Sequence, residues 1–156
     1  MDPLSIIAGT TGIADVCLRV VLFLKDIPSA VASVQQEIRI LITEVENLRA
    51  VLDSVQKTLE GYMRSSAKVS LLKATNFKDL SSKFHTSIEA CSDLATRLEE
   101  LTKDIYGKSG STVTGKLDGL RKEFRRRDKN TDLARIRMEL LAEKHNLTLL
   151  LDGINL

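Results

Sequence analysis

Residues 110–116 have the spacing with which a phosphate-binding P-loop begins, two glycines followed by a lysine. In a P-loop the backbone N–H groups surround phosphate, the lysine neutralises it, and a following Ser or Thr hydroxyl binds Mg²⁺. Here the next residue is Leu117, which offers no oxygen, and a helical pattern rather than a strand precedes the loop. The stretch is therefore interpreted as a Gly/Ser/Thr-rich connection between helices.

The histidines and cysteines do not form a catalytic or metal-binding pattern. His85 and His145 are far apart in the sequence, and neither has a second histidine or cysteine three or four residues away. Cys17 and Cys91 occupy apolar positions of helical patterns, which favours small buried side chains over a disulfide or a reactive thiol. We therefore expect no enzyme: no catalytic residue, no metal site, no cofactor, and a function in binding or rearrangement.

The apolar segment 3–24 has a length and composition that suit a bilayer. Only Asp15 and Arg19 are charged in it, and their i,i+4 spacing on a helix would let them pair. As a helix it would be roughly 33 Å long, which matches a bilayer core. It also carries small residues in a stripe that permits close approach of helices in lipid. That small-residue stripe consists of Ser5, Ala8, Gly9 and Gly12.

Two interpretations of this segment stay open, a helix that inserts into a membrane and an ordinary core helix of a bundle. In a resting bundle we expect it to cover the core with Leu4, Ile7, Leu18 and Leu22. The residues predicted to insert or assemble in a membrane are Leu4, Ser5, Ile7, Ala8, Gly9, Gly12, Ile13, Val16, Val20 and Phe23.

A basic cluster lies in the last third of the chain. From Lys116 to Lys129 there are seven cations against three anions, although the whole chain carries a net charge of only +2. Such a cluster can attract anionic lipid headgroups, with about 1 kcal/mol for each cation near the surface; a solvated helix end is the alternative. Nucleic acid is not expected, because aromatic side chains do not interleave with the cations. The predicted lipid contacts are Arg121, Lys122, Arg125, Arg126, Arg127 and Lys129.

The elements that must position these residues are all helices. Aromatic residues make up 4% of the chain and tryptophan is absent, so the core must be aliphatic. Residues 29–62 and 76–106 each carry a seven-residue apolar repeat, which predicts two long helices paired as an antiparallel hairpin. Helices are also predicted at about 3–26, 113–127 and 131–154. We therefore expect one domain over residues 1–156, an all-α, up-down bundle of four to five helices.

Four stretches of the chain together resemble the HeLo-like N-terminal domain of fungal STAND/NOD-like receptors. They are MDPLSIIAG at residues 1–9, EIRILITEVENLRAVL at 37–52, the basic KEF at 122–124, and the closing helix with HNLTLLLD at 145–152. The resemblance covers essentially the whole chain. It implies a helical bundle that induces programmed cell death by permeabilising the membrane, after clustering frees the first helix.

The resemblance also implies partners and a location. Self-association, anionic lipids and a neighbouring receptor or nucleotide-binding oligomerisation domain of the NACHT or NB-ARC kind are the expected partners. The domain would be cytoplasmic and would move to the plasma membrane on activation, in fungal immunity or heterokaryon incompatibility. The alternative is a non-lytic helical adaptor or oligomerisation module of a signalling receptor.

The basic cluster can be tested directly. Changing Arg125, Arg126 and Arg127 together to Gln should weaken binding to acidic liposomes, because each cation contributes about 1 kcal/mol near an anionic surface. Raised salt should mimic the loss, since it screens the same attraction. Liposome co-sedimentation at low and high salt measures both effects, and unchanged binding at low salt would remove the cluster from membrane attachment.

Overall fold

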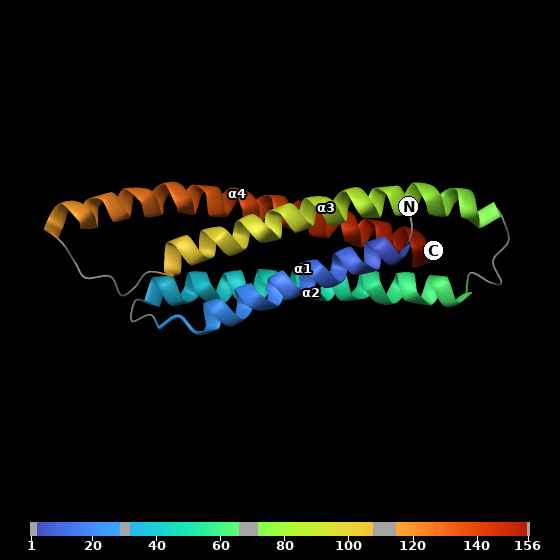
Figure 1. Cartoon of the computed structure of the whole chain (residues 1–156), viewed down its shortest axis with the longest axis horizontal. Coiled ribbons are helices and arrows are strands. Elements are labelled where there is room, and N and C mark those ends of the chain that lie inside the picture. The colour runs from blue at the N-terminus through green and yellow to red at the C-terminus, as the bar shows by residue number, and fades with distance from the viewer. Residues whose placement is uncertain (1–2, 29–31, 66–71, 108–114, 156) are drawn as a thin grey trace.

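The computed structural model describes residues 3–28, 32–65, 72–107 and 115–155, with side chains for all of these except residues 3, 65, 72–77, 115–128 and 155. The described chain forms four helices and no strand (Figure 1). They are α1 (Pro3–Lys25), α2 (Ala32–Ser65), α3 (Leu72–Tyr106) and α4 (Gly115–Asn155). The all-α class is therefore confirmed.

Two of the helices, α3 and α4, are longer than the sequence pattern indicated. The segments predicted at 113–127 and 131–154 are one continuous helix, α4, so the predicted break before Thr131 is wrong. Asn130, Thr131 and Asp132 can cap a helix, but they also fit inside one when no proline or glycine interrupts the backbone hydrogen bonds. The third helix likewise begins at Leu72 rather than at residue 76.

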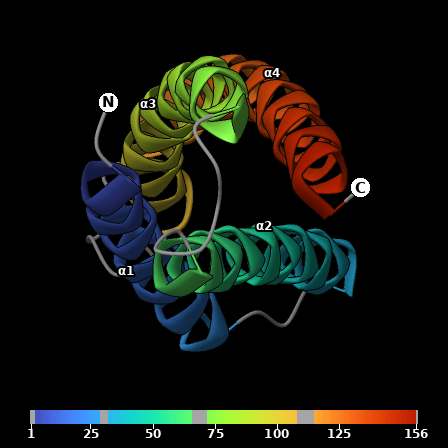
Figure 2. The same cartoon turned by 90° about the vertical axis from the view of Figure 1, so that its right-hand side faces the viewer.

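The four helices form a ring when viewed along the bundle, in the order α1, α2, α4, α3 (Figure 2). Each helix runs opposite to its sequence neighbours, so the predicted up-down arrangement is present, and the two termini lie at the same end (Figure 1). Consequently α1 packs on both α2 and α3, while α4 closes the other side of the ring against the same two helices.

The predicted direct pairing of the two long helices is wrong. α2 and α3 are antiparallel but lie diagonally across the ring, and no described Cα of one comes within 8 Å of a Cα of the other. A heptad repeat fixes which face of a helix is apolar but does not name the helix that covers it. Here α1 and α4 cover those faces, and the two long helices touch through side chains, as where the Tyr106 hydroxyl donates to Glu37 Oε2 at 3.3 Å.

The heptad columns do identify the core. On α2 the repeat supplies Ile38, Leu41, Val45, Leu48, Leu52, Val55 and Leu59, each at most 6% exposed. On α3 it supplies Phe84, Ile88, Cys91, Leu94 and Leu98, all of them buried. On α4 the buried set is Leu133, Ile136, Leu140, Leu147 and Leu151. The buried hydrophobic side chains of the described residues are aliphatic except for Phe84, Tyr106 and the two thiols, as the composition predicted.

Truncating a core leucine tests this assignment. Leu48→Ala or Leu94→Ala should lower the free energy of unfolding by about 2–5 kcal/mol, because each leaves a cavity in a buried seam. Leu149→Ala is the matched control, since that leucine lies on α4 with 55% of its surface exposed. Thermal or denaturant unfolding measures all three, and a core variant no less stable than the control would show that the core is misassigned.

Candidate membrane-active helix

The helix α1 is the one described helix whose length and hydropathy would allow it to cross a membrane. Leu4–Lys25 has a mean hydropathy of 1.8 in its most apolar 18-residue window, and only 33% of that window is buried in the bundle. Thr10 and Thr11 need no partner outside the helix, because their hydroxyls both donate to the carbonyl of Ile7, at 2.7 and 3.0 Å. Asp15, Arg19 and Lys25 are the charged residues of the segment.

The buried face of α1 differs from the predicted one. Leu4 and Leu22, expected to cover the core, are 57% and 54% exposed, while Ile7 and Leu18 are half-buried. The core face is instead formed by Ile6, Thr10, Ile13, Cys17, Val20, Val21 and Leu24. Helical spacing alone left the choice of face open, because apolar residues surround α1 on nearly all sides.

The ten predicted insertion and assembly residues do not share one environment. Ile13 and Val20 are buried, Ile7, Gly9, Val16 and Phe23 are half-buried, and Leu4, Ser5, Ala8 and Gly12 are exposed. The structure therefore divides the set between a face that holds α1 in the bundle and a face that is open to solvent.

The two glycines of the small-residue stripe have different surroundings. A Cβ on Gly9 would lie 2.8 Å from Ile88 Cγ2 on α3, so this glycine allows the close approach of α1 to α3. A Cβ on Gly12 would meet nothing within 4 Å. Gly9 is thus already used for helix packing in the resting bundle, whereas Gly12 has no neighbour that requires it to be glycine.

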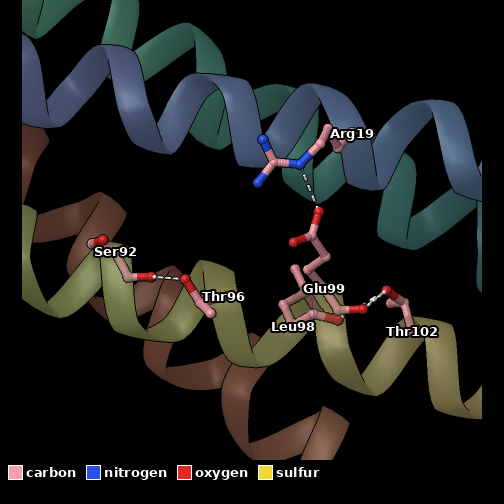
Figure 3. A network of polar contacts seen from close by, with 6 residues as sticks. All are labelled: Arg19, Ser92, Thr96, Leu98, Glu99 and Thr102. Carbon is pink, nitrogen blue, oxygen red and sulfur yellow. Dashed lines mark hydrogen bonds and ion pairs between the residues drawn. The ribbon is translucent and has the colours of Figure 1, made fainter.

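An ion pair, which the sequence pattern did not predict, connects α1 to α3. Arg19 Nε donates to Glu99 Oε2 at 2.9 Å rather than pairing with Asp15 as predicted, and Figure 3 shows Glu99 reaching from α3 towards α1. This hydrogen bond is the main reason that the pKa of Arg19 is raised; the charge of Asp15 adds a smaller contribution. Thr96 and Thr102, which lie on either side of Glu99 in the sequence of α3, hydrogen bond back to their own helix (Figure 3).

A second contact lies at the C-terminal end of α1, where Lys25 Nζ is 3.5 Å from Glu46 Oε1 on α2. Both side chains are about half exposed, at 55% and 49%. Exposed ion pairs contribute little to stability. The two contacts therefore fix the position of α1 more than they stabilise it, and the apolar face supplies most of the attachment.

Both cysteines lie in the core, as predicted. Burial raises the pKa of the Cys17 thiol to about 11 and that of Cys91 to about 12. The charge of Glu143 adds to the effect at Cys91, and Cys17 is close enough to contribute there as well. Because the thiolate is the reactive form, both thiols are inert while α1 stays in place.

The basic cluster falls largely outside the described side chains. Arg121, Lys122, Arg125, Arg126 and Arg127 lie on the backbone of α4, but their side chains are not among those described. Lys129 Nζ is 3.6 Å from Asp104 Oδ2 on α3. This predicted lipid contact is therefore engaged with a carboxylate in the bundle, and the prediction for the five arginine and lysine side chains before it stays untested.

The described residues contain no group of three or more His, Cys, Asp or Glu side chains that could hold a metal ion. His85 Nε2 is 2.9 Å from Glu89 Oε1 one turn further along α3, and His145 is exposed.

Comparisons of the chain with protein families, with characterised proteins and with solved structures found no match. The geometry of α1 and its surroundings is therefore the basis for assigning a function.

The two glycines provide a matched pair of substitutions. Gly12→Ala should stabilise the bundle by about 0.5–1 kcal/mol, because alanine is the better helix former and its methyl group meets open space. Gly9→Ala gains the same helix propensity, but its methyl group must displace Ile88. The Gly9→Ala protein should therefore be less stable than the Gly12→Ala protein by about 1–3 kcal/mol.

The Ile88→Leu background supplies the control, since leucine lacks the Cγ2 branch. In that background the difference between the two alanine variants should shrink. Chemical denaturation measures all of these stabilities. Equal stabilities for Gly9→Ala and Gly12→Ala would contradict the close approach of α1 and α3.

Proposed function

We propose that this chain is a cell-death effector domain that permeabilises membranes, on oligomerisation, through α1. The observation that carries the proposal is the apolar span Leu4–Lys25, two thirds of whose most apolar window is not buried by the bundle. The resemblance to HeLo-like domains of fungal receptors, which is a resemblance of sequence motifs alone, supports the same function. Under this proposal the resting domain is cytoplasmic and anionic lipid is its target.

The energetics of α1 suit a triggered event rather than a spontaneous one. The buried apolar face includes Ile6, Ile13, Val20, Val21 and Leu24, each at most 3% exposed. Exposing five such side chains to water would cost roughly 10 kcal/mol. Transfer into a bilayer removes that cost for α1 itself, while the vacated faces of α2 and α3 still need cover. Association of several copies can provide that cover, so insertion should depend on clustering.

The charged residues of α1 favour insertion as an assembly over insertion of a single helix. Asp15 is exposed, and Arg19 loses its partner Glu99 when α1 leaves α3. A lone ionised side chain in the bilayer centre is costly, so intramembrane charges face one another or a water-filled cavity. Asp15 and Arg19 would then pair with each other or line a pore.

A non-lytic helical adaptor is the second candidate, and a different surface supports it. On α4, Met138, Leu141 and Leu149 are 73%, 60% and 55% exposed. Such a row of large apolar side chains can bind another helical domain without any release of α1. Leakage assays separate the two candidates, because an adaptor leaves vesicles intact when it is clustered.

The ion pair between α1 and α3 yields the most direct test. Glu99→Gln removes the negative charge opposite Arg19 without changing the sequence of α1. The variant should release dye from anionic liposomes about two- to fivefold faster, because α1 is held less firmly while its ability to insert is unaltered. Fluorescence dequenching of an entrapped dye gives the rate.

Glu89→Gln is the matched control for this experiment. It makes the same chemical change on the same helix, at a carboxylate that is 68% exposed and pairs within α3. It should leave the leakage rate unchanged. Equal rates for the wild type and Glu99→Gln would contradict release of α1 as a limiting step, and no leakage from the clustered wild type would favour the adaptor.

Gly12, whose Cβ position meets no neighbouring atom in the bundle, allows a test of how α1 acts in the membrane. Gly12→Leu can be tolerated by the resting bundle, whereas Gly9→Leu would push against Ile88 and disturb it. If helices assemble through the small-residue stripe, Gly12→Leu should reduce leakage, because close backbone approach is lost. If α1 acts only through its apolarity, the added leucine should increase leakage. Thr11→Leu, an exposed neighbour outside the stripe, controls for the gain in apolarity.

A further inference from the structure

The junction between α2 and α4 contains an apolar cavity that the permeabilisation proposal does not use. These two helices have the sparsest contact of any neighbouring pair in the ring (Figure 2). Between them lies a slot of about 290 Å³, whose floor includes Leu98 of α3. Leu41, Val45 and Leu48 form its α2 side, and Leu140 and Leu141 contribute to the α4 side. We call this cavity the α2–α4 slot.

The polar lining of the slot is small and carries a net positive charge. Glu44, Arg137 and Lys144 are its ionisable residues. Arg137 holds Glu44 in a two-pronged ion pair, with Nε to Oε2 at 2.7 Å and Nη2 to Oε1 at 2.6 Å. That hydrogen bond is the main cause of the raised pKa of Arg137. Lys144 forms no ion pair among the described residues, so it is the cation left to attract a ligand.

The dimensions of the slot select among possible occupants. Arg137 and Lys144 are two turns apart on α4, and Leu41 and Leu48 are two turns apart on α2, so the slot follows both helices for about 10 Å. An apolar space of this length with one unpaired cation suits a flexible hydrocarbon chain that ends in an anion.

We propose that the α2–α4 slot binds one acyl chain of an anionic amphiphile, with the head group at Lys144. The hydrocarbon covers Met138 and Leu141, the exposed apolar side chains that line the slot, and their burial provides the affinity. Lys144 selects a carboxylate or phosphate head group. Arg137 and Glu44 neutralise each other's charge in their ion pair. The proposal does not rest on membrane permeabilisation, because the ligand binds the folded chain with α1 in place.

The test uses three soluble probes with the same twelve-carbon chain and different heads, all below their micelle concentrations. Dodecanoate represents a free fatty acid, dodecyl phosphate a phosphate-headed lipid, and dodecyltrimethylammonium a cation of equal apolarity. Titration calorimetry with the full chain should show saturable binding at one site for an anionic probe and weaker binding for the cation. Whichever of the two anionic probes binds more tightly shows whether the slot prefers a carboxylate or a phosphate head group.

Two alanines on α4 give a matched pair for locating the site. Ala134 lines the slot and is exposed, so Ala134→Phe can turn its ring into the cavity without breaking the core. It should weaken binding by more than about tenfold, because displacing two or three methylene groups loses at least that factor. Ala142 is also exposed but does not line the slot, so Ala142→Phe should bind as the wild type does.

The charge at position 144 gives an independent test that does not depend on filling the cavity. Lys144→Glu should weaken the anionic probes by about fivefold or more and favour the cationic one. Equal binding of anionic and cationic probes, or binding unaffected by Ala134→Phe, would overturn the proposal. The proposal would also be overturned if the protein dimerised in the absence of any probe and Ala134→Phe abolished the dimer. That result would assign the slot to a second copy of the protein.

Discussion

The packing of α1 against both α2 and α3 is the constraint on which the rest of the bundle depends. The two long helices lie diagonally across the ring and meet through side chains, without close approach of their described backbones. On one side α1 alone joins them, and on the other side α4 does so with sparse contact to α2. Loss of α1 would therefore leave α2 attached mainly through α4, the Arg137–Glu44 pair and the residues around the slot. Release of α1 would therefore also open the ring.

Because α1 packs on both α2 and α3, the bundle can retain an apolar helix without strong ion pairs or hydrogen bonds. The Arg19–Glu99 and Lys25–Glu46 pairs are both partly exposed and contribute modestly. The cost of leaving comes instead from two apolar faces, that of α1 and that of the helices it covers. A bilayer can solvate the apolar face of α1, and neighbouring copies of the protein can cover the vacated faces of α2 and α3. The same geometry thus accounts for a stable resting state and for dependence of the proposed activity on clustering.

The sequence predicted the helical class and most of the core, because heptad spacing records which side of a helix is buried. It did not predict the ring order, since an aliphatic face on α2 can pack equally well on α1 or on α3. It failed on α1 for a related reason: with apolar residues on almost every side, Leu4 and Leu22 were indistinguishable from Ile6 and Leu24. The break at Asn130 was predicted from capping residues, which mark a helix start but do not require one.

The candidate site was predictable only in part. Composition identified α1, yet the contacts that hold it, Glu99 and Ile88, lie on another helix and follow from no spacing within α1. The α2–α4 slot had no sequence signal at all, because its lining comes from three helices whose order around the ring was unknown.

Alkylation of the two cysteines during membrane binding tests the release of α1 most directly. Cys17 lies on α1 and Cys91 on α3, and both are buried in the resting bundle. With a membrane-impermeant maleimide present throughout binding to anionic vesicles, the account predicts that Cys91 is alkylated in the interval between the departure of α1 and the association that covers α3 again. It also predicts that Cys17 stays protected, within the bilayer. If vesicles leak while Cys91 remains as unreactive as in solution, α1 has not left the bundle and the account is wrong.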